Sequence, residues 1–196
     1  TGALLTGATL ITKRVRGIRR AAMAPVIPTV TGKAVLIDCG ANAECTAEYW
    51  VQFAYLGSFY AKSMLGLENP RVALLNIGTE PEKGTDLQRE AYGLLSAAKD
   101  INFIGNIEAK EAVKGGCDVI VCDGFSGNVM LKTIEGVGSF AGTALKGIFK
   151  KNLLTKIAAL LVMPGLNAFK AMLDPNKVGG TAFIGVSKPV LKAHGS

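Results

Sequence analysis

The feature that most constrains the fold is a repeated order of apolar strand, polar glycine-containing turn and helical segment. Val119 to Cys122 has the composition of a buried strand and continues directly into Asp-Gly-Phe-Ser-Gly-Asn and then a helical pattern. Similar units occur four times along the chain. The expected strands are 35–37, 72–77, 102–104 and 119–122, and the expected helices are 46–65, 86–99, 107–114 and a stretch after 128. This order predicts an α/β fold, in which a mostly parallel sheet has helices on both faces and forms a three-layer sandwich.

Composition limits the number of domains and the kinds of partner. The 196 residues are 49% hydrophobic and 19% charged, which suits one folded core, and we expect a single α/β domain over residues 1–196. Lys and Arg outnumber Asp and Glu by 22 to 15. Such a surface suits an acidic protein or anionic lipid, or it is simply a solvated basic face. Nucleic acid is disfavoured, because the basic residues are not interleaved with aromatic ones and the chain has one Trp.

The cysteines predict buried free thiols rather than a metal site. Cys39, Cys45, Cys117 and Cys122 form no C-x-x-C pair, and the single histidine, His194, is distant from them in sequence. We therefore expect no metal and a reducing compartment. Cys122 is interpreted as a buried strand residue, not a nucleophile, because no histidine is near it in sequence to activate it.

The polar turns are expected to meet at one edge of the sheet, since the carboxyl ends of parallel strands lie along the same edge and ligands bind there. The residues expected to line this edge are Asp38, Asn42, Gly78, Thr79, Lys83, Asn106, Asp123, Gly124, Ser126, Gly127 and Asn128. Glycine backbone, hydroxyl and amide donors, and one lysine together suit a phosphate group. The simpler alternative is that Asp123 and Ser126 only cap the following helix.

Nucleotide motifs do not fit the chain. No P-loop sequence occurs, and Gly136 to Ala141 matches G-x-G-x-x-A only inside a helical stretch that does not directly follow a strand. A dinucleotide-dependent dehydrogenase is therefore disfavoured.

A second unusual stretch, residues 150–166, combines lysines with an apolar run that is too short to span a bilayer. Such a helix can rest on an anionic membrane. We expect the contact residues Leu160, Leu161, Val162 and Met163 at a helical tip, with Lys150, Lys151 and Lys156 around its base. The alternative is an ordinary core or dimer-interface helix.

Several stretches together resemble the PlsX family, the phosphate acyltransferases of bacterial phospholipid synthesis. They are IDCGAN (37–42), LLNIGTEPEKG (74–84), FIGNIEAKE (103–111), VCDGFSGNVMLKTIEG (121–136), GGTAFIGV (179–186) and AHGS (193–196). The resemblance implies a fold similar to those of phosphotransacetylases and isopropylmalate dehydrogenases, with a protruding helical pair near 140–172. It also implies that residues 1–196 are the carboxyl-terminal part of a longer enzyme, because the family carries an Asp-Ala-Met-Gly-Gly-Asp motif and a Gly-Asn before the Thr-Gly-Ala found at Thr1.

The resemblance further implies the reaction: acyl carrier protein donates its acyl group to inorganic phosphate, and no cofactor is needed. It implies a homodimer that is cytoplasmic and peripherally bound at the inner face of the membrane. Phosphate would be held by Thr1, Gly2, Lys83, Ser126 and Asn128, with help from Asn106. The candidate catalytic residues are Asp123, His194 and Lys83. The rival hypothesis is a non-catalytic module that binds acyl carrier protein or lipid on the same fold.

Overall fold

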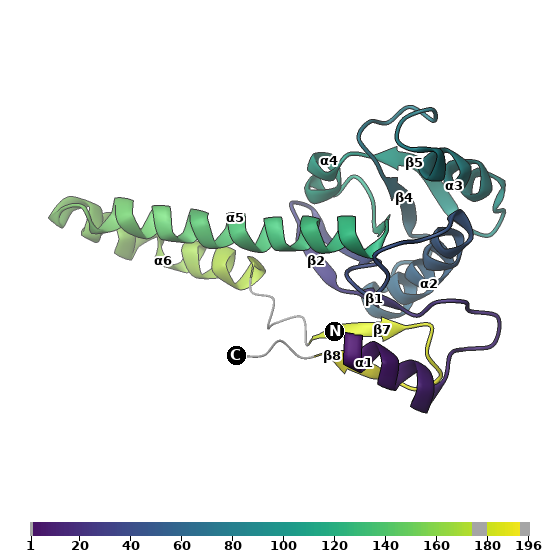
Figure 1. Cartoon of the computed structure of the whole chain (residues 1–196). Helices are drawn as coiled ribbons and strands as arrows, with labels where there is room; N and C mark the ends of the chain where they lie inside the picture. Colours follow the sequence, from purple (N-terminus) through teal and green to yellow (C-terminus); the bar gives the residue numbers. More distant parts are fainter. Residues whose placement is uncertain (1, 174–179, 193–196) are drawn as a thin grey trace.

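The computed structural model describes residues 2–173 and 180–192, and its centre is a five-stranded sheet (Figure 1). The strand order is β2-β3-β6-β4-β5. Their bounds are Val26–Thr29 (β2), Gly32–Ile37 (β3), Val119–Val121 (β6), Arg71–Leu75 (β4) and Asn102–Ile107 (β5). β3, β6, β4 and β5 are parallel, and only β2 is antiparallel to its neighbour. The predicted α/β class with a mostly parallel sheet is confirmed.

Helices cover both faces of this sheet, because its strands are apolar on both sides. In β3, Val35 and Ile37 pack in one cluster, whereas Ala34 and Leu36 pack in the other. The first cluster includes side chains of α2 (Ala47–Leu65) and α3 (Asp86–Ala97), and the second includes side chains of α4 (Ala109–Lys114) and of the start of α5 (Gly124–Lys150). The three layers follow from this double burial.

Local signals fix the ends of two helices close to where the sequence predicts them. α2 ends at Gly66, which adopts the left-handed conformation (φ +69°) that glycine accepts without strain. α3 begins with a capping box, in which the Thr85 side chain accepts from the backbone of Gln88 and the Gln88 side chain accepts from the backbone of Thr85.

The amino-terminal segment and the last strands form a smaller unit beside the main sheet. α1 (Gly2–Gly7) continues as a short π-helical stretch, η1 (Ala8–Thr12). β1 (Ala22–Ala24), β7 (Thr181–Ile184) and β8 (Val190–Lys192) form an antiparallel sheet in the order β1-β7-β8.

Two of the differences from the predicted boundaries affect the predicted site. β5 extends to Ile107, so Gly105 and Asn106 lie within the strand rather than after it. α5 starts at Gly124, not after residue 128, so Ser126, Gly127 and Asn128 belong to its first turns. The reason for the second difference is the cap that Asp123 provides, described below.

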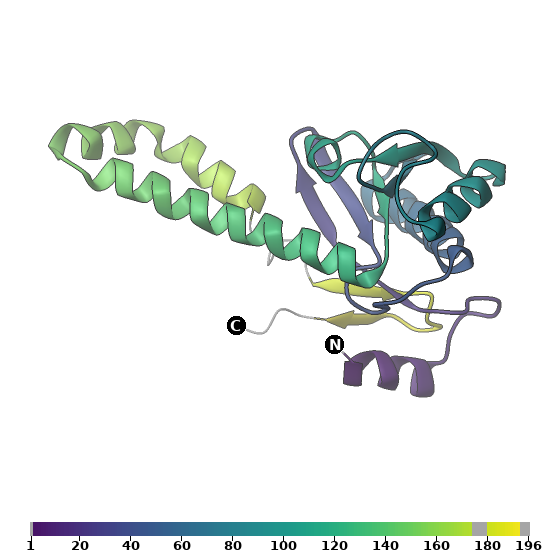
Figure 2. The same cartoon turned by 45° about the horizontal axis from the view of Figure 1, so that its top comes forward.

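α5 and α6 (Leu153–Leu173) form a long hairpin that protrudes from the body (Figures 1 and 2). Its turn is at residues 151–152, inside the stretch expected to be one helix. The lysines therefore lie at and next to the tip, and Leu160 to Met163 lie further back along α6, the reverse of the expected order. Within residues 2–173 and 180–192, no helix has both the length and the apolar character that a membrane span requires.

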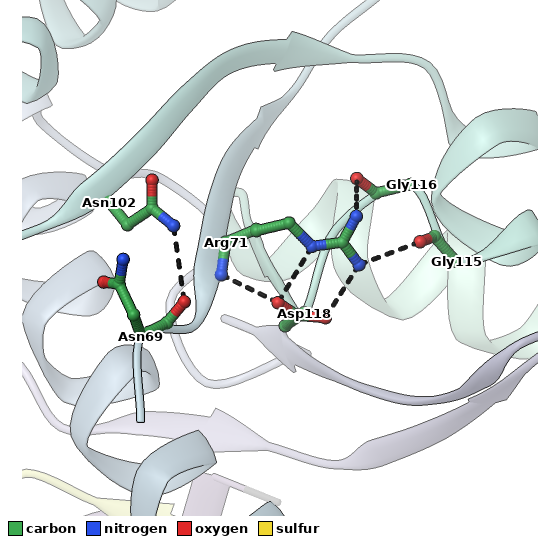
Figure 3. Close-up of polar contacts among 6 residues, drawn as sticks. All are labelled: Asn69, Arg71, Asn102, Gly115, Gly116 and Asp118. Atoms are coloured by element: carbon green, nitrogen blue, oxygen red, sulfur yellow. Dashed lines mark hydrogen bonds and ion pairs between the residues drawn. The ribbon is translucent and has the colours of Figure 1, made fainter. Parts of the chain in front are cut away.

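The amino-terminal edge of the sheet is closed by Arg71 at the start of β4 (Figure 3). Its guanidinium donates to both carboxylate oxygens of Asp118, at 3.1 and 2.9 Å, and to the carbonyls of Gly115 and Gly116. Burial alone would raise the pKa of Asp118, but the hydrogen bonds and the charge of Arg71 hold this pKa below its ordinary value. This network ties the α4–β6 loop to β4.

Candidate functional site

The parallel strands end level with one another, at the edge where the sequence predicts a site. Ile37 pairs with Val121, Val121 with Leu74, and Leu75 with Ile107. The connections after β3 and β6, which are neighbours, lead to opposite faces of the sheet, because α2 covers one face and α5 begins on the other. In α/β sheets such a switch point opens the crevice where ligands bind. We call residues 38–42, 76–85 and 122–128 the polar edge.

Asp38 is the most buried charged residue of the polar edge, and its carboxylate is used inside the protein. Oδ1 accepts from the backbone N–H groups of Met23 (2.8 Å), Cys39 (2.7 Å) and Ala41 (3.3 Å). Oδ2 accepts from the backbone (2.6 Å) and the side-chain amide (2.9 Å) of Asn42. Burial raises the pKa of Asp38, and these donors oppose the increase. Asp38 thus holds the 38–42 turn in shape.

Asn42 joins this turn to the elements on either side. Its amide donates to the carbonyl of Ala21 at 2.8 Å as well as to Asp38, and its own carbonyl accepts from the backbone N–H of Gly124 at 2.7 Å. Both amide donors of Asn42 are therefore directed into the protein. The residue positions the first turn of α5 rather than presenting its amide to solvent.

Gly124 and Gly127 permit a close approach between this turn and α5. A Cβ atom at Gly124 would lie 2.6 Å from the carbonyl oxygen of Asn42, and one at Gly127 would lie 2.0 Å from that of Asp38. Neither distance leaves room for a side chain against backbone atoms. These two glycines of the predicted site are therefore required by packing alone.

Asp123 and Ser126 bind each other at the start of α5. The carboxylate of Asp123 accepts from the backbone N–H of Ser126 at 2.7 Å and from its hydroxyl at 2.9 Å. This is an N-cap, and it places a negative charge at the positive end of the helix. Helix capping, the simpler alternative for Asp123 and Ser126, is therefore present in the structure.

The 76–85 loop is shaped by two asparagines. The Asn76 amide donates to the carbonyl of Lys83 at 3.0 Å, and its oxygen accepts from the N–H of Ile77 at 2.8 Å. The Asn106 amide reaches across from β5 and donates to the carbonyl of Glu80 at 2.8 Å. Asn76 is absent from the predicted site because the strand was expected to run to residue 77, whereas β4 ends at Leu75.

Four predicted residues lie on the accessible side of the polar edge. Lys83, Thr79 and Asn128 are exposed, and Gly78 is half-buried. A Cβ atom at Gly78 would lie 2.9 Å from the Glu80 carboxylate and 3.0 Å from the Lys83 stem. Asn128 lies against Gly40, because a Cβ atom at Gly40 would be 3.6 Å from its amide oxygen. Lys83 and Asn128 therefore come from two different turns of one edge.

Three predicted site residues lie near the chain ends. Thr1 and His194 lie outside the described residues. Gly2 opens α1, whose Leu5 packs against the cluster that contains Phe183 of β7.

The cysteines are free, and three of the four are buried. Burial, with the nearby carboxylates, raises the pKa of Cys39, Cys45 and Cys117 to about 12 and that of Cys122 well above its ordinary value. The Cys122 thiol donates to the carbonyl of Asp38 at 3.3 Å. These thiols are protonated at neutral pH and act as small core residues.

A hollow of about 450 Å³ lies elsewhere, at the amino-terminal edge of the sheet beside Arg71 and Asp118. It is lined by Thr29, Thr31, Lys33, Leu65 and Leu67 among others. None of the predicted site residues lines it, and the chemistry of the motifs belongs to the opposite edge.

The fold places the chain among the open α/β proteins, a class in which ligands generally bind at the carboxyl ends of the parallel strands. Two solved structures share the fold. The EutD phosphotransacetylase from Staphylococcus aureus has a TM-score of 0.53 and 19% identity, and covers 67% of this chain and 46% of its own. A phosphotransacetylase from Streptococcus pyogenes has a TM-score of 0.55 and 20% identity, and covers 69% of this chain and 47% of its own. At this identity the likeness shows the fold alone.

The family follows from the sequence matches. A family model described as fatty acid synthesis protein matches residues 1–196, and the chain belongs to this family, which confirms the resemblance to PlsX proteins. A protein named phosphate acyltransferase from Alkaliphilus oremlandii is 51% identical over 195 residues, which are 100% of this chain and 58% of that protein. One of the same name from Caldanaerobacter subterraneus is 45% identical over 196 residues, which are 100% of this chain and 59% of that protein. The chain thus spans less than two thirds of these relatives.

Proposed function

We propose that this chain is the carboxyl-terminal part of a phosphate acyltransferase that moves an acyl group from acyl carrier protein to inorganic phosphate. The observation that carries the proposal is the match along the whole chain, at 43–51% identity, to curated proteins named phosphate acyltransferase. The polar edge supports it, since it places hydrogen-bond donors and a lysine at a position typical of ligand sites in α/β sheets.

The reaction requires little chemical machinery from the protein. A phosphate oxygen attacks the thioester carbonyl, a C–O bond forms, the C–S bond breaks, and the proton of hydrogen phosphate ends on the carrier thiol. Phosphate is already a nucleophile, so the protein must mainly hold it, direct it and stabilise the oxyanion that forms. Donors fixed before the reaction serve this better than mobile ones.

Within the described residues, Lys83, Thr79 and Asn128 are the side chains that suit direct contact with phosphate, because they are exposed at the polar edge. Asn76 and Asn106 fix the backbone of the loop that carries Lys83. Asp123 acts by orienting Ser126 and the first turn of α5, and Asp38 and Asn42 act as positioning residues. Direct roles for Thr1, Gly2 and His194 rest on the motif resemblance alone.

The hairpin is proposed to contact an anionic membrane peripherally. The whole protein is proposed to be a cytoplasmic homodimer that takes part in phospholipid synthesis. Leu160, Leu161, Val162 and Met163 are 40–80% exposed on α6. Residues 136–173 contain five lysines and no acidic residue. Apolar side chains and positive charge on one protruding element favour an anionic lipid surface.

The test uses the full-length parent protein. Acyl-acyl carrier protein and phosphate are incubated with it, acyl phosphate is trapped with hydroxylamine as the hydroxamate, and the free carrier thiol is measured in parallel. Equal amounts of both products, formed only when phosphate is present, are expected. Binding of the carrier protein or of vesicles without phosphate-dependent thioester cleavage would instead establish the non-catalytic alternative.

A further inference from the structure

The positive charge of the chain is concentrated in its first part. Residues 1–37 contain six Lys or Arg residues and no Asp or Glu, whereas the rest of the chain has 16 basic and 15 acidic residues. Five of the six basic residues, Lys13, Arg14, Arg16, Arg19 and Arg20, lie in one stretch of eight. We call residues 13–20 the basic segment. Nearly all of the formal charge of +7 therefore comes from residues before Asp38.

The basic segment is held in a fixed position on two sides. On one side, the N–H of Val15 donates to the carbonyl of Gly185 at 3.0 Å, and that of Ser187 donates to the carbonyl of Lys13 at 2.9 Å. On the other side, Gln52 of α2 accepts from the N–H of Arg19 at 2.8 Å and donates to the carbonyl of Gly17 at 3.2 Å. Because its backbone is anchored, the segment presents its cations with little conformational freedom to lose on binding.

The segment lies beside the polar edge. Arg19 pairs with Glu48 at 2.9 Å, and the Arg20 guanidinium lies 5.7 Å from the ring centre of Tyr49, so both arginines lie over the first turn of α2. That turn follows the 38–42 loop. The next residue, Ala21, accepts the amide of Asn42 through its carbonyl. The basic segment is thus adjacent in the chain to a residue that contacts Asn42, which positions α5.

Its composition is that of a protein interface. Four of the five cations are arginines, which form planar paired bonds with carboxylates and are enriched where proteins meet, while lysines are depleted there. Exposed apolar side chains adjoin them in sequence: Leu10 is 72%, Ile11 81% and Val15 46% exposed. In the hairpin, by contrast, all the basic residues are lysines. The tip of the hairpin lies at the far end of the molecule from the loop after α1 (Figures 1 and 2). The basic segment and the hairpin tip are therefore two separate basic surfaces.

We infer that the basic segment is the docking surface for an acidic protein that carries the acyl thioester to the polar edge. The inference rests on the proposed function for the identity of that partner, which is acyl carrier protein. Docking here would place the carrier next to the 38–42 turn. The charge attraction would increase the rate of encounter and fix the orientation of the carrier.

The experiment compares two thioester donors in the full-length parent protein. The variant is Lys13→Gln, Arg16→Gln and Arg20→Gln, which keeps polar stems and removes three charges. The matched control is Lys33→Gln, Lys62→Gln and Lys99→Gln, which removes three exposed lysines elsewhere. The donors are octanoyl-acyl carrier protein and octanoyl-pantetheine, which has the same thioester without the acidic protein.

The expected result is a KM for octanoyl-acyl carrier protein raised by about 10-fold or more in the variant, with an unchanged kcat/KM for octanoyl-pantetheine. The control triple should leave both unchanged. An unchanged KM for the carrier substrate overturns the inference while the proposed function stands. A loss with both donors also overturns it, because the segment would then support the site itself.

Two further measurements keep the tests separate. If the parent protein forms acyl phosphate from neither donor, the proposed function fails. Docking is then measured directly by the fluorescence anisotropy of labelled acyl carrier protein. Equal binding of the carrier by wild type and by the triple variant would overturn the inference. Lost binding to phosphatidylglycerol vesicles with unchanged carrier binding would assign the segment to lipid and overturn it. If the triple variant does not fold, Arg16→Gln alone should raise the carrier KM about two- to threefold.

Discussion

The two ends of helix α5 are held by opposite kinds of contact. Its first turns lie in the polar edge, and its only buried residues, Gly124, Gly127 and Met130, are all there. Its far half lies in the hairpin, where Phe140 is 74% and Ile148 58% exposed. The first end is specified by backbone atoms in direct contact, which only glycine permits. The second packs against one neighbouring helix, α6, and leaves apolar side chains exposed.

The comparison predicts that one methyl group has opposite effects at the two ends. In Gly127→Ala the new Cβ would meet the Asp38 carbonyl at 2.0 Å, and the free energy of unfolding should fall by about 3–5 kcal/mol. Gly142→Ala, with no heavy atom within 4 Å of the new group, should raise it by up to about 1 kcal/mol. Urea denaturation measures both. Equal effects at the two positions would show that the first turn is not packed as described.

The hairpin end is tested by adding charge to its apolar surface. Leu161→Asp with Val162→Asp should weaken binding to anionic vesicles by about 100-fold, because apolar burial is lost and two negative charges are added. Val30→Asp with Leu94→Asp, at exposed positions of the body, adds the same charge as a control. Vesicle co-sedimentation measures both. Acyl phosphate formation in solution should survive in each variant. Persistent vesicle binding with lost activity would assign these residues to the core or the acyl site.

The polar edge end is tested through the buried carboxylate that supports it. Asp38→Asn should lower the free energy of unfolding by about 1–3 kcal/mol at pH 7. The reason is that the amide NH₂ group of asparagine would replace a carboxylate oxygen that accepts hydrogen bonds from N–H groups. The pKa of Asp38 is raised above its ordinary value of 3.8 in the folded protein. The stability that this group contributes is then fully present below pH 3.8 and is lost as pH rises through the raised pKa.

The difference in unfolding free energy between wild type and Asp38→Asn should therefore widen as the pH is lowered through that range. Denaturation at several pH values measures it. A difference that does not change with pH would show that burial and the N–H donors balance at Asp38.

The structure around the polar edge is predicted from the sequence better than that of the hairpin. Strand periodicity and the glycine after α2 are local signals, and the parallel order of strands brings the turns together without further information. The start of α5 is predicted too late, because Asp-Gly-Phe-Ser-Gly-Asn contains two poor helix formers. The Asp123 cap and the contact of Gly127 with Asp38 outweigh that preference, and the contact is not local in sequence.

The hairpin turn, however, had a readable signal. Asn152 accepts from the N–H of Thr155 at 2.9 Å, and its own N–H donates to the Thr155 hydroxyl at 3.0 Å, which is a reciprocal cap at the start of α6. An asparagine three residues before a threonine, ahead of an apolar run, indicates such a start. Asn76 had a weaker signal, because its role depends on the carbonyl of Lys83, seven residues away, and on the shape of the loop between them.

The smallest expected effect concerns the exposed side of the polar edge. Asp38, Asn42 and Asp123 use their polar groups inside the protein, whereas Lys83 is exposed on a loop whose backbone Asn76 and Asn106 hold in place. If Lys83 contacts phosphate, Lys83→Ala in the full-length parent should raise the KM for phosphate about fivefold, because one charge-assisted contact to the dianion is lost. The unfolding free energy should stay within about 0.5 kcal/mol, as for other surface changes. Lys99→Ala, at an exposed position outside the polar edge, is the matched control and should change neither value. A phosphate KM that does not change in Lys83→Ala would make Lys83 a surface lysine, and direct phosphate contact would then have to come from Asn128, Thr79 and backbone N–H groups of the same edge.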